Sequence, residues 1–135
     1  KKMEYKEEGL ELKPKLLEGE FIFCSLEGAS YGNYKDLKPI ASFQEKEGLT
    51  LVISKEKANR NNISYDSSFR CISLGLVSKL EDFGLTSIIS NRLTKNKISA
   101  NIFSGKYHDH IFIPSDKANE SLIILNDINK RQEKR

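Results

Sequence analysis

Two histidines separated by one residue are the side chains with the clearest capacity for metal chemistry. His108 and His110 flank Asp109 in a run of strand-forming residues. Alternate residues of a strand project from the same face, so two imidazoles at this spacing can share a zinc ion. Because the chain has no third histidine and the ligand set is incomplete, we predict no metal site. We expect instead that one imidazole packs or hydrogen-bonds across a hairpin while Asp109 supports the turn.

A pair of carboxylates is the other candidate for chemistry. Glu45 and Glu47 share a face if this segment is a strand, and paired carboxylates can act as an acid and a base. No nucleophile or oxyanion site accompanies them, so we predict that the protein is not an enzyme. Exposed surface charge is the simpler interpretation of both residues. Glu47 remains a candidate for the rim of a polar pocket, where it would receive a ligand's ammonium group.

The composition limits the classes of function. The chain has 135 residues, of which 38% are hydrophobic, enough for one compact domain or two small units that share a core. Its net charge of +3 comes from interspersed signs, so we expect no basic face for nucleic acid. The sequence has no apolar stretch of about 18 residues, and its first residues, KKMEYKEE, lack the apolar core of a signal peptide, so we expect a cytoplasmic protein without a membrane partner. Cys24 and Cys71 lie in strand-like runs and are expected to be buried thiols.

An internal repeat organises the chain. Residues 38–59 align without a gap with residues 98–119, at an offset of 60. The β-rich runs at 21–26 and 69–74 also resemble each other, but their offset is 48. A repeat of this length indicates a duplicated supersecondary unit. The difference between the two offsets indicates that the second copy contains an insertion between its first and second strands, or that the first copy has lost that segment.

The insertion predicts a helix in the second copy only. Leu85, Ile88, Ile89 and Leu93 are spaced to form one apolar face of a helix. The equivalent residues of the first copy, 27–38, are too few and too rich in Gly, Asn and Tyr for a comparable helix. We predict a loop there.

Each copy continues with a β-hairpin and a further helix. The predicted hairpin strands are 40–46 with 49–53 in the first copy and 98–104 with 110–113 in the second. Ser54 and Ser115 are predicted to cap the helices that follow. The second copy then lacks a fourth strand, and we predict that residues 10–14, where apolar and charged side chains alternate, complete its sheet.

These elements predict an α+β, ferredoxin-like sandwich. It would contain two interlocked βαββαβ-type repeats, of which the first lacks its first helix. We predict a first unit at residues 10–66, a second unit at 67–128 and a charged tail at 129–135. The strand near residues 67–76 is expected to serve as an edge for both sheets.

Two stretches of the sequence resemble a known family. They are residues 45–54, which contain a Glu-Gly-Leu-Thr run, and residues 80–114, which end in His-Asp-His-Ile-Phe-Ile-Pro. Together they resemble small bacterial tandem ACT-like proteins, and they are similar to the paired ACT units of aspartate kinases and arginine-sensing proteins. The resemblance covers roughly residues 10–127. It implies a ferredoxin-like βαββαβ architecture with two copies per chain, commonly assembled side by side into larger sheets.

The resemblance also implies a ligand site in the second copy. The ACT family uses the glycine of its strand-to-helix loop, here Gly84, to let the backbone approach an amino-acid effector. Gly84, Leu85 and Thr86 would then form a clamp with Asn101 and Ile102 of the neighbouring strand. A helix N-terminus offers unpaired N–H groups and a positive dipole end, which suits a carboxylate. The alternative is that Gly84 only allows close packing between helix and sheet.

These observations together predict a noncatalytic regulatory module. We expect it to bind an amino acid or a similar small metabolite, to need no cofactor and to form a homodimer, because edge-to-edge pairing covers exposed sheet edges. The alternative is a structural or protein-interaction module that binds no small ligand. An RNA-binding role would need surface aromatics on central strands, and Phe103 and Phe112 are better explained as core residues.

Overall fold

The structure is a computed structural model that describes residues 12–75 and 84–133. The chain forms two compact units. The central unit contains residues Glu18–Phe69, and the terminal unit contains Lys1–Leu17 together with Arg70–Arg135. The sequence had placed the division between residues 66 and 67 and had not assigned the N-terminal segment to the second unit as a whole.

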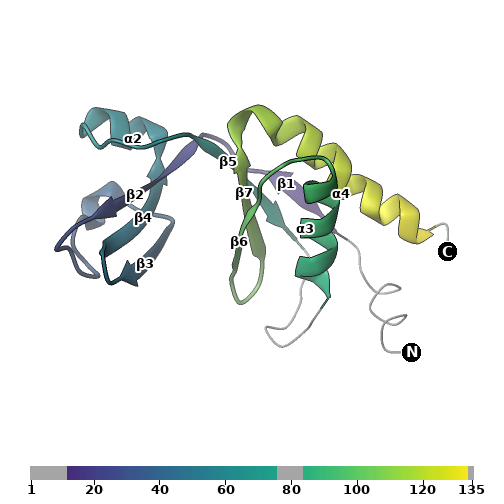
Figure 1. The fold of residues 1–135 in the computed structure, drawn as a ribbon, viewed down its shortest axis with the longest axis horizontal. Coiled ribbons are helices and arrows are strands. Elements are labelled where there is room, and N and C mark those ends of the chain that lie inside the picture. The colour runs from purple at the N-terminus through teal and green to yellow at the C-terminus, as the bar shows by residue number, and fades with distance from the viewer. Residues whose placement is uncertain (1–11, 76–83, 134–135) are drawn as a thin grey trace. The chain divides into compact units, whose positions relative to one another are not determined.

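The central unit is a three-stranded antiparallel sheet with one α-helix (Figure 1). Its elements are β2 (Phe21–Leu26), the 3-10 helix η1 (Lys35–Leu37), β3 (Ala41–Glu45), β4 (Gly48–Ser54) and α2 (Lys55–Arg60). The strand order is β3-β4-β2, and β2 pairs with β4 over its whole length. As predicted, β2 and β3 are joined by a loop whose only described helix is the single turn of η1.

Alternation along the strands builds the core of the central unit. One face of β2 and β4 forms this core, because successive side chains of a strand point to opposite faces. On the other face Phe21 and Val52 are also buried. That core contains Ile22, Cys24, Leu49, Leu51 and Ile53 from the strands, with Ala29, Leu37 and Ala58 from the loop and α2. The prediction that Ser54 caps the following helix is confirmed, since its Oγ accepts a hydrogen bond from the Lys57 N–H at 3.1 Å.

The terminal unit is a four-stranded sheet with two α-helices. Its elements are β1 (Pro14–Leu16), β5 (Phe69–Leu74), α3 (Leu85–Lys95), β6 (Asn101–Ser104), β7 (Asp109–Pro114), the 3-10 helix η2 (Ser115–Lys117) and α4 (Ala118–Glu133). The strand order is β1-β5-β7-β6. Strand β5 begins in the central unit, where Phe69 pairs with Phe21, and continues in the terminal unit.

The N-terminal segment supplies the fourth strand of this sheet. β1 pairs with β5 in antiparallel register, from Pro14 opposite Leu74 to Leu16 opposite Ile72. Leu12, 2% exposed, is part of the core of the terminal unit. The strand therefore starts at Pro14, whereas the sequence had placed it at residues 10–14, of which 10 and 11 lie outside the described residues.

Both helices of the terminal unit pack on one core. It contains Ile89 and Leu93 of α3, Leu125 and Ile128 of α4, and alternate residues Ile72, Leu74, Ile111 and Ile113 of β5 and β7. The helix predicted from the apolar spacing is thus present as α3. Phe112 is also buried, at 2% exposure, and its ring meets that of Phe103 edge to face at 5.4 Å, but Phe103 is only half-buried and neither residue is part of this core.

One predicted helix start is wrong. Ser115 is the first residue of η2, and Pro114 occupies the N-cap position before it. A 3-10 turn precedes α4, so the two copies begin their last helices differently. The α+β, ferredoxin-like fold class itself is confirmed.

Candidate functional site

The first part of the predicted clamp, Gly84, Leu85 and Thr86, lies at the start of α3. Gly84 is the N-cap of α3, with φ of 104° in the left-handed region that favours glycine. It has no side chain that could cap the helix, and the first turn of α3 contains no acidic residue. The Leu85 and Thr86 N–H groups therefore lie at the positive end of the helix. Thr86 is exposed, and the side chain of Leu85 is outside the described part of the chain.

Asn101 and Ile102 lie at the other end of the terminal unit. Asn101 is exposed at the start of β6, where its Nδ2 donates to the Phe112 carbonyl at 3.4 Å, and Ile102 packs against the core. Figure 1 shows α3 starting at the end of the unit where the β6–β7 turn lies, whereas β6 starts at the opposite end. The 11 residues of α3 span about 16 Å. Within one chain, the structure does not bring Asn101 together with Gly84.

Glu47 belongs to the central unit and lies in a turn. It is exposed between the end of β3 and the start of β4, so it does not share a strand face with Glu45. Glu45 ends β3 and accepts a hydrogen bond from the Thr50 hydroxyl. The paired-carboxylate arrangement considered from the sequence is therefore wrong. The turn explains this, because Lys46 and Glu47 connect the two strands instead of extending the first.

The histidines of the His-Asp-His segment, residues 108–110, make contacts within the fold. β7 begins at Asp109, so His108 precedes the strand. His108 Nδ1 lies 3.2 Å from the Leu74 carbonyl of β5, and the two imidazole centroids are 6.4 Å apart. The imidazole hydrogen bond thus goes to a neighbouring strand instead of across the hairpin. In the residues that the structure describes, no group of three His, Cys, Asp or Glu side chains is placed to hold a metal ion.

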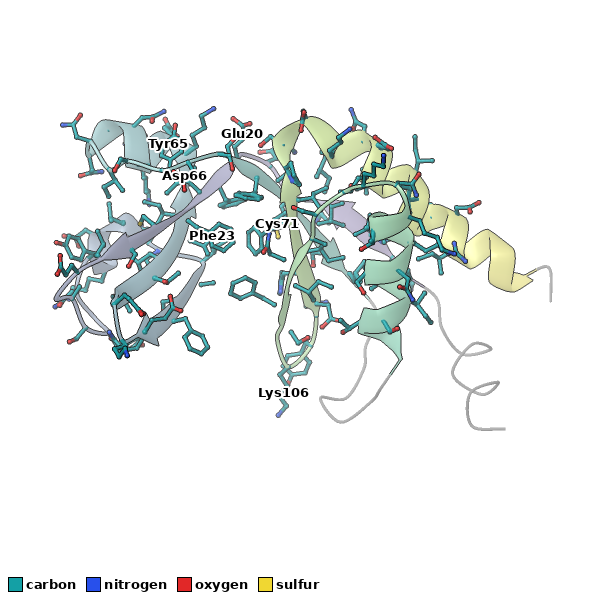
Figure 2. The ribbon with its side chains drawn as sticks, viewed as in Figure 1. Glu20, Phe23, Tyr65, Asp66, Cys71 and Lys106 are labelled. Atoms are coloured by element: carbon teal, nitrogen blue, oxygen red, sulfur yellow. The ribbon has the colours of Figure 1, made fainter. Side chains whose placement is uncertain are left out.

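The β6–β7 turn is closed by backbone contacts. The Gly105 N–H donates to the His108 carbonyl at 2.9 Å, and a Cβ at Gly105 would lie 3.1 Å from that oxygen. Lys106 lies at the tip of the hairpin (Figure 2), with its Nζ 5.8 Å from the centre of the Tyr107 ring. This tip stands at the same end of the unit as the start of α3 (Figure 1).

Both cysteines are buried free thiols. Burial raises the pKa of the Cys71 thiol from its ordinary value of 9.0 to about 11. Burial also raises the pKa of Cys24, although a backbone hydrogen bond with Leu51 acts in the opposite direction. Neither thiol has the lowered pKa of a reactive cysteine.

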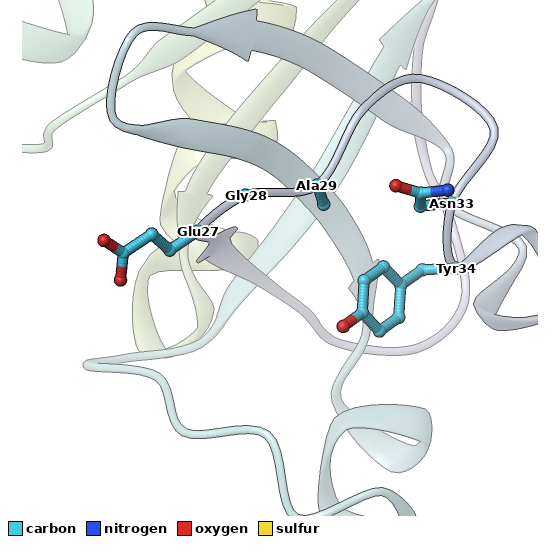
Figure 3. Close-up of a pocket in the computed structure, with 5 residues that line it drawn as sticks. All are labelled: Glu27, Gly28, Ala29, Asn33 and Tyr34. Atoms are coloured by element: carbon cyan, nitrogen blue, oxygen red, sulfur yellow. The ribbon is translucent and has the colours of Figure 1, made fainter.

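One pocket was not foreseen from the sequence. Glu27, Gly28, Ala29, Asn33 and Tyr34 of the loop between β2 and β3 line it, within the central unit (Figure 3). The signal in the sequence is the density of Gly, Asn and Tyr in this loop. Tyr31 and Tyr34 are able to cover a ligand or a partner surface, but singly exposed tyrosines are common, so they did not identify a site.

Comparisons with known proteins place the chain among ACT domains. A family model described as an ACT domain matches residues 10–70. No curated protein is significantly similar in sequence to the chain. In the part of the chain that the structure describes, no helix is both long enough and apolar enough to cross a membrane.

Solved structures extend the likeness over most of the chain. A protein of unknown function from Vibrio cholerae, described as a possible transport protein, is 43% identical, with a TM-score of 0.79 over 83% of this chain and 85% of its own. The aspartate kinase of Clostridium acetobutylicum is 12% identical, with a TM-score of 0.62 over 87% of this chain and 34% of the kinase.

The regulatory subunit of aspartate kinase from Thermus thermophilus, in its ligand-free form, is similar over 85% of this chain and 95% of its own. It is 9% identical, with a TM-score of 0.60. At these low identities, the two aspartate kinase structures show a shared fold alone.

Proposed function

The chain belongs to the ACT domain family, and from that premise we propose that it is a noncatalytic regulatory module that binds an amino acid or a similar small metabolite. The observation that carries the proposal is the open start of α3, where Gly84 leaves the first N–H groups of the helix without a side-chain cap. These groups and the helix dipole favour the carboxylate of a ligand. The likeness to an aspartate kinase regulatory subunit adds support through the fold.

The second half of the clamp would come from a second copy of the chain. β6 lies at the end of the strand order, and unpaired edge strands readily pair with another chain. Antiparallel strands run in opposite directions, so the start of one β6 would lie beside the end of its partner. The end of β6 lies at the same end of the terminal unit as the start of α3 (Figure 1). A homodimer of this kind would bring Asn101 and Ile102 of one chain near Gly84 of the other.

The role of Glu47 in this proposal is separate. It is exposed in a turn of the central unit, and its carboxylate is able to receive an ammonium group there. We propose it as an accessory contact only. Glu47→Gln should leave the binding of carboxylates at α3 unchanged.

A thermal-shift panel of the common amino acids tests the proposal. A ligand present at 100 times its dissociation constant should stabilise the protein by roughly 2.7 kcal/mol. Gly84→Ala should abolish that shift, because the new Cβ stands where the ligand approaches. Gly19→Ala is the matched control, since Gly19 has a similar φ of 89° and nothing within 4 Å of a Cβ. A panel without any shift, or equal shifts in the two variants, would contradict the proposal.

A protein-interaction module without a small ligand is the second candidate. The observation that favours it is Phe43, which is 67% exposed on β3, a strand at the end of the order in the central unit. An exposed aromatic side chain on an edge strand is suited to pairing with another chain. This candidate predicts that Phe43→Ser changes the state of association while no amino acid changes the melting temperature.

A further inference from the structure

Strand β3 is an unprotected edge of the sheet in the central unit. It is the last strand in the order, so among the described strands it pairs with β4 alone, and all five of its residues are in register with β4. Proteins usually protect such edges with lysine, proline, a bulge or a very short strand. β1, at an edge of the terminal unit, follows this rule, because it has three residues and contains Pro14 and Lys15. β3 has none of these features.

Two exposed apolar side chains lie along this edge. Phe43, the middle residue of β3, is 67% exposed, and Ile40, just before the strand, is 51% exposed. Phe43 lies opposite Thr50 of β4. The core of the unit is on the other face, where Leu49 and Leu51 contribute to it. A phenylalanine this exposed does little to stabilise its own unit, whereas a chain paired along the edge would cover much of its ring.

The charges along the edge are complementary to a second copy of the same edge. Lys38 precedes β3 and is exposed. The end of β3 and the turn after it hold Glu45, Lys46 and Glu47, two carboxylates and one ammonium group with a net charge of −1, and all three are exposed. Two identical strands that pair antiparallel place the start of each beside the end of the other. The positive start of one β3 would therefore lie beside the negative end of the other, at both ends of the pair.

We propose that β3 pairs antiparallel with β3 of a second copy of this chain, with the two-fold axis at Phe43. Phe43 is the middle residue, so this register pairs the whole strand and sets Phe43 opposite the partner's Phe43, where two aromatic side chains stabilise a sheet. Ser42 lies opposite the partner's Gln44. Ala41 lies opposite the partner's Glu45, so no charged residue of β3 faces one of like sign. The pairing needs no ligand at α3 and is separate from the β6 pairing proposed for the clamp.

Cysteine crosslinking of the full chain tests this register. Opposite residues of an antiparallel pair have Cα atoms about 4.5–5.5 Å apart, a distance that a disulfide bridges, so Phe43→Cys should form a covalent dimer under mild oxidation. Gln44→Cys is the matched control, because the two copies of residue 44 would be diagonal neighbours about 7–8 Å apart. An equal mixture of Ser42→Cys and Gln44→Cys should crosslink, whereas either variant alone should not. Wild type, whose Cys24 and Cys71 are buried, is oxidised in parallel.

Sedimentation of the full chain over a range of concentrations tests whether the pairing forms without a covalent bond. Phe43→Lys places two ammonium groups opposite each other at the two-fold axis, and like charges at such positions oppose pairing. The dissociation constant of self-association should rise at least about 10-fold. Ile123→Lys is the matched control and should leave this constant unchanged, because Ile123 is 70% exposed on α4, in the terminal unit.

The proposal is overturned if Phe43→Cys gives no more covalent dimer than Gln44→Cys, or if Phe43→Lys and Ile123→Lys associate equally well. A wild-type chain that stays monomeric at millimolar concentration would overturn it as well. A dimer that Phe43→Lys leaves intact is joined elsewhere, and that result would overturn the pairing of β3 while leaving the β6 pairing and the ligand site at α3 to their own tests.

Discussion

Helix α3 and the loop between β2 and β3 occupy the same place in the repeat, yet they cover their sheets differently. α3 buries Ile89 and Leu93 completely, whereas the loop buries Ala29 and Leu37 at its two ends and exposes the residues between them. The helix offers a ligand backbone N–H groups at its start. The loop offers an amide and a hydroxyl on side chains. The two copies therefore differ at this position both in packing and in the chemistry available to a ligand.

The starts of the helices differ in a related way. α2 begins after Ser54, whose hydroxyl caps it, and it has Glu56 in the first turn. α3 begins after Gly84 and has neither feature. A capped helix start has its N–H groups partly satisfied, while an uncapped one retains donors for a ligand. The difference indicates that α2 is a structural helix and that α3 is the better candidate for recognition.

The largest expected effect is on the free energy of unfolding, and it compares how α3 and the loop between β2 and β3 pack against their sheets. Leu93→Ala should lower the free energy of unfolding by about 2–5 kcal/mol, because it leaves a cavity between α3 and the sheet. Leu37→Ala in the loop should cost less, since the loop has more freedom to close over the space. Chemical denaturation of both variants measures this. Equal losses of unfolding free energy would show that the loop packs as tightly as the helix and would contradict the proposed difference between them.

The next largest effect should distinguish the β3–β4 hairpin of the central unit from the β6–β7 hairpin of the terminal unit. A Cβ on Gly48 would lie 2.8 Å from the Leu26 carbonyl oxygen, so Gly48→Ala forces the neighbouring strand to move. Overpacking of this kind costs about 1–3 kcal/mol. Gly105→Ala, whose nearest contact is 3.1 Å, should cost less. Thermal unfolding of the two variants tests the order, and a larger loss at Gly105 would contradict it.

The cap of α2 should have a smaller effect. Ser54→Ala removes the acceptor for the Lys57 N–H and should destabilise the protein by about 1 kcal/mol. Ser54→Asp keeps an acceptor and should retain most of the stability. If alanine and aspartate are equally destabilising in urea titrations, the hydrogen bond is not the cause, and the contrast between α2 and α3 is weakened.

The smallest expected effect is a pH dependence of stability. The pKa of Cys71 is about 11 in the folded protein against an ordinary 9.0, so the folded state keeps a proton that the unfolded state releases. The stabilisation is complete below pH 9 and is lost as the pH rises towards 11. The difference in unfolding free energy between wild type and Cys71→Ala should therefore shrink over this interval. A difference that stays constant with pH would contradict the assignment.

Most of the fold could be predicted because its signals are local. The period of apolar residues located α3, and the alternation of side chains located the strands of both hairpins. The exact start of β1 could not be predicted, because Pro14 was interpreted as the end of a strand. Proline is tolerated as the first residue of an edge strand, where its missing N–H is not needed, and β1 begins there.

Less of the candidate site could be predicted. The position of Gly84 at the helix start follows from sequence spacing, but the separation of Asn101 from it depends on the direction of β6 relative to α3. That direction is a property of tertiary structure and leaves no periodic signal. The pocket beside Tyr34 could not be predicted for a similar reason, because it depends on how residues 27–34 fold over the sheet, which leaves no periodic signal.

The most direct test of the ligand site is an affinity measurement by calorimetry, made with whichever amino acid gives the largest thermal shift. Asn101→Asp replaces a donor with a negative charge on β6, and Asn126→Asp makes the same change at an exposed position of α4. The account predicts that Asn101→Asp binds at least about 10-fold more weakly than wild type while Asn126→Asp is unchanged. Equal affinities for the two variants would contradict a clamp that joins Asn101 of one chain to Gly84 of another.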